Sequence, residues 1–281
     1  MESRAALITG CSSGIGHATA QRLAAEGWKV YATARRPETI ADLAAKGATT
    51  LALDVTDEQS MSAAVNALVE AEGAVGVLVN NAGYSQSGAV ETVPIDQVRR
   101  QFETNVFGLT RMCQLVLPGM REQRWGKIVN IGSMGGRLTF PGGGIYHATK
   151  YAVEAISDAL RFEVRGFGVD VILVEPGLIV TNFGEAAAAS VSETGEGGPY
   201  AHFNHKVASL TVDAYQGPMA KLGGSPETVA KTIADALRSA RPKARYPVTA
   251  SAHLMINQRR LTPDRLWDLM MRSQFPTPGT T

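Results

Sequence analysis

The chain has 281 residues, 44% of them hydrophobic, and its 27 basic residues almost balance its 26 acidic residues, leaving a net charge of +1. This length suits one or two domains, and the apolar content is sufficient for a sizeable core. A charge so close to zero gives no electrostatic reason to expect a nucleic acid partner.

Short β-rich runs alternate with longer helical patterns as far as about residue 180. This alternation predicts an α/β fold, a Rossmann-type doubly wound parallel sheet of about seven strands with helices on both faces. Residues 77–79 and 171–174 are apolar without alternation, as central strands covered on both faces should be. We predict strands over 5–9, 29–33, 49–53, 75–80, 126–131, 170–174 and 245–248, and helices over 14–26, 37–46, 58–72, 95–120, 145–166 and 226–239.

A glycine-rich turn at residues 9–16, reading TGCSSGIG, lies between the first strand and the first helix. Glycine lets the backbone approach a pyrophosphate, and the helix N-terminus supplies free amides and positive potential. The spacing differs from the GxGxxG of long-known dehydrogenases. From this turn we assign to a dinucleotide Gly10, Ser12, Ser13, Gly14, Ile15 and Gly16.

The end of the second strand discriminates between dinucleotides. An acidic residue there binds the ribose of NAD, whereas arginine accommodates the extra phosphate of NADP. The sequence has no acid at this point but has Arg35 and Arg36. A guanidinium matches a phosphate well, so we predict NADP(H) as the cofactor, with Arg35 the first choice and Arg36 the second. The alternative is that both arginines are simply solvated.

Tyr146 and Lys150 are one helical turn apart, and Ser133 lies upstream. Bringing a tyrosine pKa from about 10 to near 7 requires roughly 4 kcal/mol of phenolate stabilisation, which we expect from Lys150 and an oxidised nicotinamide. Tyr146 would then exchange a proton with a carbonyl or alcohol oxygen during hydride transfer, while Ser133 hydrogen-bonds that oxygen. Alone, this pair could be an ordinary helical pair; Ser133 and the glycine turn argue against that reading.

Three histidines, His147, His202 and His205, are not expected to bind a metal or to transfer protons. His202 and His205 lack an accompanying cysteine or carboxylate pattern, so we expect no metal site. His147 directly follows Tyr146 and points about 100 degrees away from it on a helix. We therefore expect His147 to shape the edge of the pocket or to pack, and not to transfer protons.

Two segments depart from the alternating pattern. Residues 182–224 contain an alanine run and the turn-rich 193–199, and we predict an insertion on the substrate side, because such segments are usually lids or binding loops. The extension 251–281 contains a probable helix from Thr262, with an apolar stripe beside Trp267 and arginines nearby. Covering the cleft or contacting another subunit is favoured over lying on a membrane surface. We treat residues 1–281 as one domain.

The remaining sequence signals concern location. We expect no signal peptide, because the first residues lack the pattern of one, and the most apolar run, residues 169–180, contains Asp170 and Glu175 and falls short of the roughly 20 residues of a transmembrane segment. Cys11 and Cys113 provide no disulfide framework and suit a reducing environment. We therefore expect a cytoplasmic protein without a transmembrane segment.

With these motifs in order, the chain resembles the classical short-chain dehydrogenase/reductase family over most of residues 5–250. The resemblance implies that Asn105 holds a water that links Lys150 to solvent as a proton relay, and that Tyr146 and Lys150 also bind the nicotinamide ribose. It further implies adenine and adenosine-ribose contacts from Asp54, Val55, Asn81, Ala82 and Gly83, and nicotinamide contacts from Pro176, Gly177, Ile179 and Thr181.

Within that family the chain is similar to the branch that includes 17β-hydroxysteroid and retinol dehydrogenases, which implies a fairly apolar ketone or secondary alcohol as substrate. Candidate pocket residues are Phe140, Phe183, Tyr200, Phe203, Tyr215 and Met219. The family's habit of pairing helices 95–120 and 145–166 between subunits, with small residues on the latter, implies a homodimer or homotetramer.

Two other functions compete with a carbonyl reductase. A sugar-nucleotide epimerase on a related fold is disfavoured by the glycine spacing and the chain length. A dinucleotide-sensing regulatory protein without turnover need not keep the proton-transfer residues, whereas this chain has all four of them, Asn105, Ser133, Tyr146 and Lys150.

Overall fold

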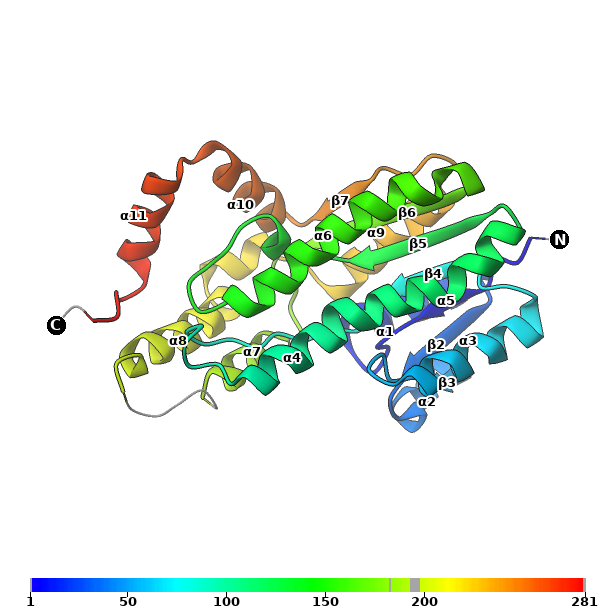
Figure 1. Cartoon of the computed structure of the whole chain (residues 1–281), viewed down its shortest axis with the longest axis horizontal. Coiled ribbons are helices and arrows are strands. Elements are labelled where there is room, and N and C mark those ends of the chain that lie inside the picture. The colour runs from blue at the N-terminus through cyan, green and yellow to red at the C-terminus, as the bar shows by residue number, and fades with distance from the viewer. Residues whose placement is uncertain (1, 182, 193–197, 280–281) are drawn as a thin grey trace.

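The computed structural model describes residues 2–181, 183–192 and 198–279, and in this part of the chain seven parallel strands form one sheet (Figure 1). The strand order is β3-β2-β1-β4-β5-β6-β7. This confirms the predicted Rossmann-type sheet, and every predicted strand end lies within two residues of the observed one. The strands are β1 (Ala6–Ile8), β2 (Val30–Ala34), β3 (Thr49–Ala52), β4 (Val77–Asn80), β5 (Gly126–Ile131), β6 (Val169–Pro176) and β7 (Arg245–Val248).

The predicted helices are present, with two corrections. The expected single helix over 95–120 contains a π-helical segment, η2, between two α-helical parts, and the expected helix over 37–46 begins as a 3₁₀ turn, η1. Sequence periodicity does not register such local changes of hydrogen-bond pattern. The elements are α1 (Gly14–Ala25), η1 (Pro37–Ile40), α2 (Ala41–Ala45), α3 (Glu58–Glu72), α4 (Ile95–Phe102), η2 (Glu103–Gly108), α5 (Leu109–Glu122), η3 (Met134–Gly136), α6 (Gly144–Val164), η4 (Arg165–Phe167) and α9 (Pro226–Arg238).

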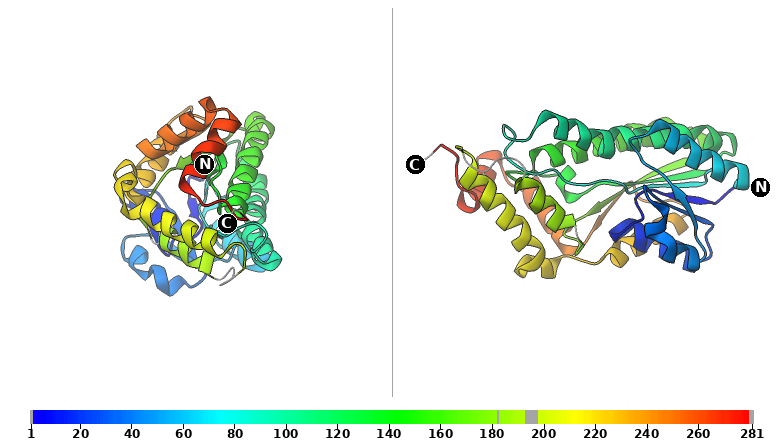
Figure 2. Two further views of the ribbon diagram at one scale, coloured as in Figure 1. Left: turned by 90° about the vertical axis from the view of Figure 1, so that its left-hand side faces the viewer. Right: turned by 90° about the horizontal axis from the view of Figure 1, so that it is seen from below.

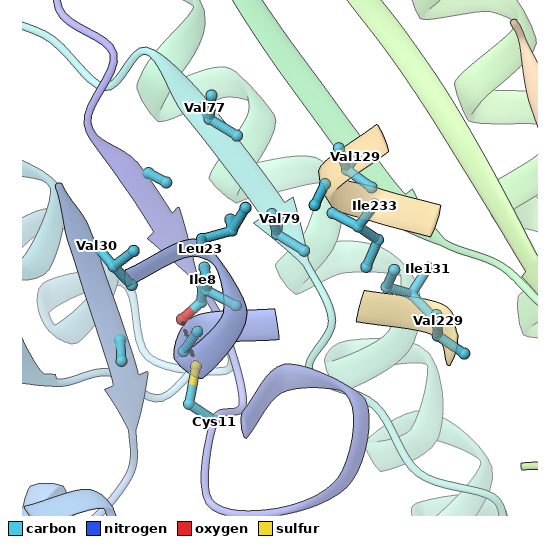
Figure 3. Packing of buried hydrophobic residues seen from close by; sticks show 14 of the residues in the cluster. Ile8, Cys11, Leu23, Val30, Val77, Val79, Val129, Ile131, Val229 and Ile233 are labelled. Atoms are coloured by element: carbon cyan, nitrogen blue, oxygen red, sulfur yellow. Dashed lines mark hydrogen bonds between the residues drawn. The ribbon is translucent and has the colours of Figure 1, made fainter. Parts of the chain in front are cut away.

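Helices cover both faces of the sheet (Figure 2), and each face has its own apolar core. On one face Leu23 of α1 and Ile233 of α9 pack with Ile8, Val79 and Val129 of the central strands (Figure 3). On the other face α3, α5 and α6 pack against alternate residues of the same strands. Strands buried on both sides read as continuous apolar runs, which is why they could be located from the sequence.

The order of the strands reverses between β1 and β4, which are neighbours in the sheet. In open parallel sheets ligands bind at the carboxyl ends of the strands at such a switch point. Here Asn81, directly after β4, donates from Nδ2 to the carbonyls of Thr9 and Gly10, while Thr9 Oγ1 accepts from the amides of Asn81 and Ala82. These bonds fix the two loops that leave β1 and β4 against each other.

The insertion and the extension are helical. The insertion forms α7 (Phe183–Ser192), α8 (Ala201–Gln216) and the 3₁₀ turn η5 (Pro218–Leu222), and the alanine run falls in α7, as the high helix propensity of alanine favours. Part of the turn-rich segment, residues 193–197, lies outside the described residues. The extension forms α10 (Ala250–Leu261) and α11 (Asp264–Gln274). All four helices gather at the end of the molecule opposite the N-terminus (Figure 1).

Candidate active site

One large cavity, of about 1430 Å³, opens at the carboxyl ends of the strands. It brings together most of the residues that the sequence singled out; Gly16, Arg36 and Asn105 are not among its lining residues. The predicted site residues that line it are Gly10, Ser12, Ser13, Gly14, Ile15, Arg35, Asp54, Val55, Asn81, Ala82, Gly83, Ser133, Tyr146, Lys150, Pro176, Gly177, Ile179 and Thr181.

The glycine turn forms one end of this cavity. Gly10 and Gly14 have φ angles of +71° and +59°, which L-residues with side chains rarely adopt. Gly16 acts by packing, since a Cβ there would lie 2.4 Å from both the Gly10 carbonyl oxygen and Asn81 Nδ2. Ser13, at the N-cap of α1, makes no side-chain capping bond to the helix. The turn is therefore a close-approach cradle at the positive end of a helix dipole, which suits a pyrophosphate.

Along the same wall, Arg35 lines the cavity and Arg36 does not. Both side chains are exposed, and among the described residues neither forms an ion pair with a carboxylate. The carbonyl of Arg36 accepts from the amide and hydroxyl of Thr39 at the start of η1. Asp54 Oδ1 accepts from the amide and hydroxyl of Thr56, which orders the loop after β3. Only Arg35 is thus placed to reach a group bound in the cavity.

Ser133, Tyr146 and Lys150 meet at the middle of the cavity. Ser133 follows β5, and its Oγ accepts from the Gly135 amide at 3.0 Å. Tyr146 and Lys150 project from the first turns of α6, and the Tyr146 hydroxyl is hydrogen-bonded to Ser133. Lys150 Nζ donates to the Ile131 carbonyl at 2.8 Å and lies 5.9 Å from the centroid of the Tyr146 ring. A hydroxyl, a phenol and an amine therefore face one space.

The electrostatics of this group differ from the sequence expectation. Burial raises the pKa of Tyr146 above its ordinary value, and the hydrogen bond to Ser133 only partly opposes this effect. Burial also lowers the pKa of Lys150 to about 8, although the charge of Glu154 counteracts it. In the protein alone, burial therefore sets the pKa of Tyr146, and the acidification expected from Lys150 together with an oxidised nicotinamide stays a prediction.

Asn105 lies in η2 and is committed to protein partners. Its Nδ2 donates to the Tyr84 carbonyl and to Thr149 Oγ1, and its Oδ1 accepts from the Tyr84 amide. The side chain thus fixes the segment after Gly83 to α6, and none of these three hydrogen bonds involves Lys150. The sequence alone did not single out Tyr84 and Thr149, because both act through hydrogen bonds between segments distant in the chain.

His147 is held on both ring nitrogens. Nε2 accepts from the Phe140 amide, so Nδ1 carries the proton and donates to the Gly135 carbonyl at 2.8 Å. Burial lowers the pKa of His147. The histidine is therefore a neutral brace between α6 and the Ser133 loop, in line with the packing role expected from the sequence.

The other end of the cavity is apolar and is closed by the insertion and the extension. Of the six pocket candidates, Phe140, Phe183, Tyr215 and Met219 line it, but Tyr200 and Phe203 do not. Tyr200 donates to Glu91, and Phe203 packs in a separate cluster with Phe275, so these two assignments were wrong. The extension contributes lining residues that the sequence did not assign: Leu254, Met255, Gln258, Trp267, Met270, Met271, Gln274 and Phe275.

The described residues show neither a membrane-spanning helix nor a metal-ligand cluster. No described helix is long and apolar enough to cross a bilayer. His202 and His205 are exposed on α8, and the described residues contain no cluster of three or more potential metal ligands. Cys11 and Cys113 are buried free thiols, and burial raises the pKa of each to about 12.

A sequence model described as short chain dehydrogenase matches residues 4–191. The fold and the site thus define a nicotinamide-type Rossmann oxidoreductase architecture, and the chain belongs to the short-chain dehydrogenase family. The narrower likeness to hydroxysteroid and retinol dehydrogenases stays a prediction.

Individual relatives are similar over most of the chain. A 3-ketodihydrosphingosine reductase of Bacteroides thetaiotaomicron is 43% identical over 72% of this chain and 73% of its own length. An NADPH-dependent 3-dehydrocapnine reductase of Ornithobacterium rhinotracheale is 36% identical over 94% and 95%. A crystal structure of a short-chain dehydrogenase from Streptomyces avermitilis is 35% identical, with a TM-score of 0.81 over 96% of this chain and 98% of that one. A Burkholderia phymatum member in complex with NAD is 26% identical, with a TM-score of 0.78 over 100% and 98%.

Proposed function

We propose that this protein is an NADP(H)-dependent oxidoreductase that interconverts a ketone and a secondary alcohol carried on an apolar chain. The observation that carries the proposal is the meeting of Ser133, Tyr146 and Lys150 between a dinucleotide cradle and an apolar chamber of the same cavity. A nicotinamide dinucleotide, when bound, supplies or accepts the hydride. The chain's own residues bind the dinucleotide, orient the substrate and give a proton to the substrate oxygen.

The proton chemistry follows from the buried hydroxyl. A phenol with a raised pKa is fully protonated at neutral pH, so Tyr146 Oη donates a hydrogen bond to a carbonyl oxygen and gives it the proton as negative charge develops there. Ser133 Oγ hydrogen-bonds the same oxygen. In the alcohol-to-ketone direction Tyr146 has to act as the base, and this direction is favoured at higher pH.

Lys150 has two roles in the proposal. Its Nζ, held by the Ile131 carbonyl, retains further donors for the nicotinamide ribose, and its positive charge stabilises the phenolate that forms when Tyr146 gives up its proton. The proposed proton relay through Asn105 uses the backbone of η2, because the amide side chain is already engaged with Tyr84 and Thr149. A π-helical segment changes the local pairing of backbone carbonyls, which supports that assignment.

The preference for NADP(H) is supported by the position of Arg35 and by the absence of an acid at the end of β2. The Ornithobacterium relative is described as NADPH-dependent, whereas the Burkholderia neighbour is in complex with NAD. The cofactor preference of this chain therefore has to be argued from its own residues at the end of β2. We expect Arg35→Ala to weaken NADPH binding about 10- to 100-fold, since a charge-assisted hydrogen bond contributes about 1.5–3 kcal/mol, while NADH binding changes little.

Fluorescence titration of both dinucleotides measures this difference. Arg36→Ala is the matched control, because Arg36 is equally exposed but does not line the cavity. Equal losses for NADPH and NADH in the Arg35 variant would refute the phosphate assignment.

The apolar chamber supports a substrate with a long hydrocarbon portion. The names of the two reductases specify 3-keto and 3-dehydro compounds, and we propose a ketone of the same sphingoid-like kind, with a steroid-like ketone as the runner-up. If the chain of the substrate enters the chamber, kcat/KM for a homologous series of ketones should rise about fourfold per methylene, because each buried methylene contributes about 0.8 kcal/mol, until the chamber is filled.

Trp267 offers a direct test of where that chain lies. It is 5% exposed and lines the cavity from α11, whereas its neighbour Leu266 is 50% exposed and does not. We expect Trp267→Ala to lower kcat/KM for long-chain ketones at least tenfold and to leave short ketones almost unaffected, and Leu266→Ala to change neither. A uniform loss over the whole series would mean that Trp267 stabilises the fold and does not contact substrate.

A further inference from the structure

A buried cluster of charged side chains lies directly behind Lys150. Tyr146, Lys150, Glu154 and Asp158 follow one another at intervals of four along α6, so they share one face of the helix. The first two reach the cavity, and Glu154 lies in the interior behind them with its side chain 9% exposed. The proposed reaction assigns no role to Glu154.

Glu154 meets a second buried carboxyl. Glu175, on β6, is 1% exposed, and it alternates with Val171 and Leu173, which pack in the core on the α6 face of the sheet. The two carboxyl groups are within hydrogen-bonding reach of each other, and Glu154 Oε1 has no donor among the described residues. Two carboxylates can form a hydrogen bond only if one of them carries a proton. Arg137 and Arg245 each lie within 3.9 Å of both carboxyl groups, so the two groups are neighbours in the interior, and a proton shared between them would reduce the repulsion of two buried charges.

The charges around this pair come from every element packed against it. Arg245 of β7 donates from Nε to Glu154 Oε2 at 3.0 Å and lies 3.7 Å from Glu175, and it also binds Asp158. Arg137, at the end of η3, lies 3.2 Å from Glu175 and 3.9 Å from Glu154. The remaining charged neighbours on α6 are Lys150 and Arg161, of which Arg161 binds Asp158.

The pair also touches the loop that carries Ser133. A Cβ added at Gly136 would lie 3.2 Å from Glu154 Oε1, and one at Gly132 would lie 3.5 Å from it. The carboxyl of Glu154 thus packs against the backbone on both sides of Ser133 and, on its own helix, follows Lys150 by one turn. Changes in its charge act on Lys150 directly, and on Ser133 through this packing.

We propose that Glu154 and Glu175 share a single proton and act as positioning residues, so that release of this proton holds Lys150 in its ammonium form as the pH rises. The proton passes to water near Arg137, whose side chain is 38% exposed, and the pair then carries two negative charges in place of one. The positioning role rests on the proposed function, whereas the shared proton does not. Burial and the proximity of Glu175 raise the pKa of Glu154 to about 8, a value that belongs to the pair.

The shared proton has a consequence for stability that needs no substrate. Because the folded chain keeps this proton up to about pH 8 while the unfolded chain releases it near pH 4.5, the pair's contribution to stability is present in acid and declines as the pH rises between these values. We expect thermal unfolding of wild type and Glu154→Gln to diverge over this window, with the variant gaining relative to wild type as the pH increases. Parallel curves would overturn the shared proton.

The positioning role is tested by the pH dependence of turnover. Glu154→Gln fixes the pair at one negative charge, so Lys150 loses its additional stabilisation and the alkaline limb of kcat/KM should move to lower pH by about one unit. Glu175→Gln should give the same shift, because either variant removes the same ionisation. Asp158→Asn is the matched control: Asp158 also binds Arg245, but its side chain is 44% exposed and it is not a member of the pair, so the variant should leave the limb in place.

The shared proton and the positioning role of the pair can be refuted separately. Diverging stability curves with an unmoved alkaline limb would uphold the shared proton and overturn the positioning role. Diverging curves in a protein that reduces no ketone would uphold the shared proton, refute the proposed function and remove the positioning role with it.

Discussion

Tyr146→Phe should lower kcat for ketone reduction by about two to four orders of magnitude, the usual contribution of a general acid. The ring remains between Phe183 and His147, with which it is now in contact, so the fold should be retained. Only the hydroxyl that reaches Ser133 is lost. NADPH binding should weaken by no more than about tenfold, the effect of one lost hydrogen bond. Steady-state kinetics and fluorescence titration measure the two quantities.

Tyr151→Phe is the control for this variant. Tyr151 lies on the same helix one residue beyond Lys150, but it is 45% exposed and does not line the large cavity. Its hydroxyl should be dispensable. If the Tyr146 variant kept its turnover, the assignment of the proton donor would be wrong; if wild type bound NADPH and gave a regulatory response without turnover, the sensor alternative would be favoured.

Gly16→Ala should nearly abolish dinucleotide binding and destabilise the fold. The added Cβ would lie 2.4 Å from the Gly10 carbonyl oxygen and from Asn81 Nδ2, and the first of these atoms is backbone that cannot turn away. Relief of the clash has to displace the turn or break the Asn81 bonds that tie it to the β4 loop, at a cost on the order of 1–3 kcal/mol. Thermal unfolding and NADPH titration should both show the loss.

Gly166→Ala provides the comparison for this second variant. An added Cβ at Gly166 meets nothing within 4 Å, so neither stability nor dinucleotide binding should fall. Unchanged NADPH affinity in the Gly16 variant would show that the turn does not need close approach of α1 to its loops.

The sheet could be predicted from the sequence because its strands are apolar on both faces. Val77, Leu78 and Val79 of β4 are fully buried, and so are Ile172, Leu173 and Val174 of β6. An apolar run of this kind has few other places in a soluble protein. The helices of the insertion were harder to predict from the sequence. Their apolar residues line the cavity or pack in small clusters around it, and they do not form one stripe against the sheet.

The candidate site was foreseen where its chemistry lies in short motifs, as in the glycine turn and in Tyr146 and Lys150. It was missed where it depends on contacts between distant segments. For the helix with Trp267 the sequence left cleft cover and subunit contact both open, and it did not single out Phe275, since nothing in the sequence fixes where α11 folds back. Glu175 carried a signal, an acid inside the most apolar run of the chain, and such an interruption in a buried strand is expensive unless the group is paired or protonated.

The direction of the pKa shift of Tyr146 in the protein alone could not be predicted from the sequence, for a related reason. The sequence places an amine one turn from Tyr146, but it does not reveal that Tyr146 is half-buried and Lys150 buried. Desolvation by burial raises the pKa of Tyr146 and lowers that of Lys150. Spacing identifies the interacting groups, whereas burial sets the balance between them.

Transfer of deuterium from NADPH labelled at the nicotinamide C4 position is the most direct test of the central claim. The protein should place one deuterium on the carbinol carbon of a long-chain ketone, detected by mass spectrometry of the alcohol, and Tyr146→Phe should give almost none under the same conditions. Equal labelling by both proteins, or binding of NADPH without label transfer to any ketone of the series, would contradict the proposed reaction.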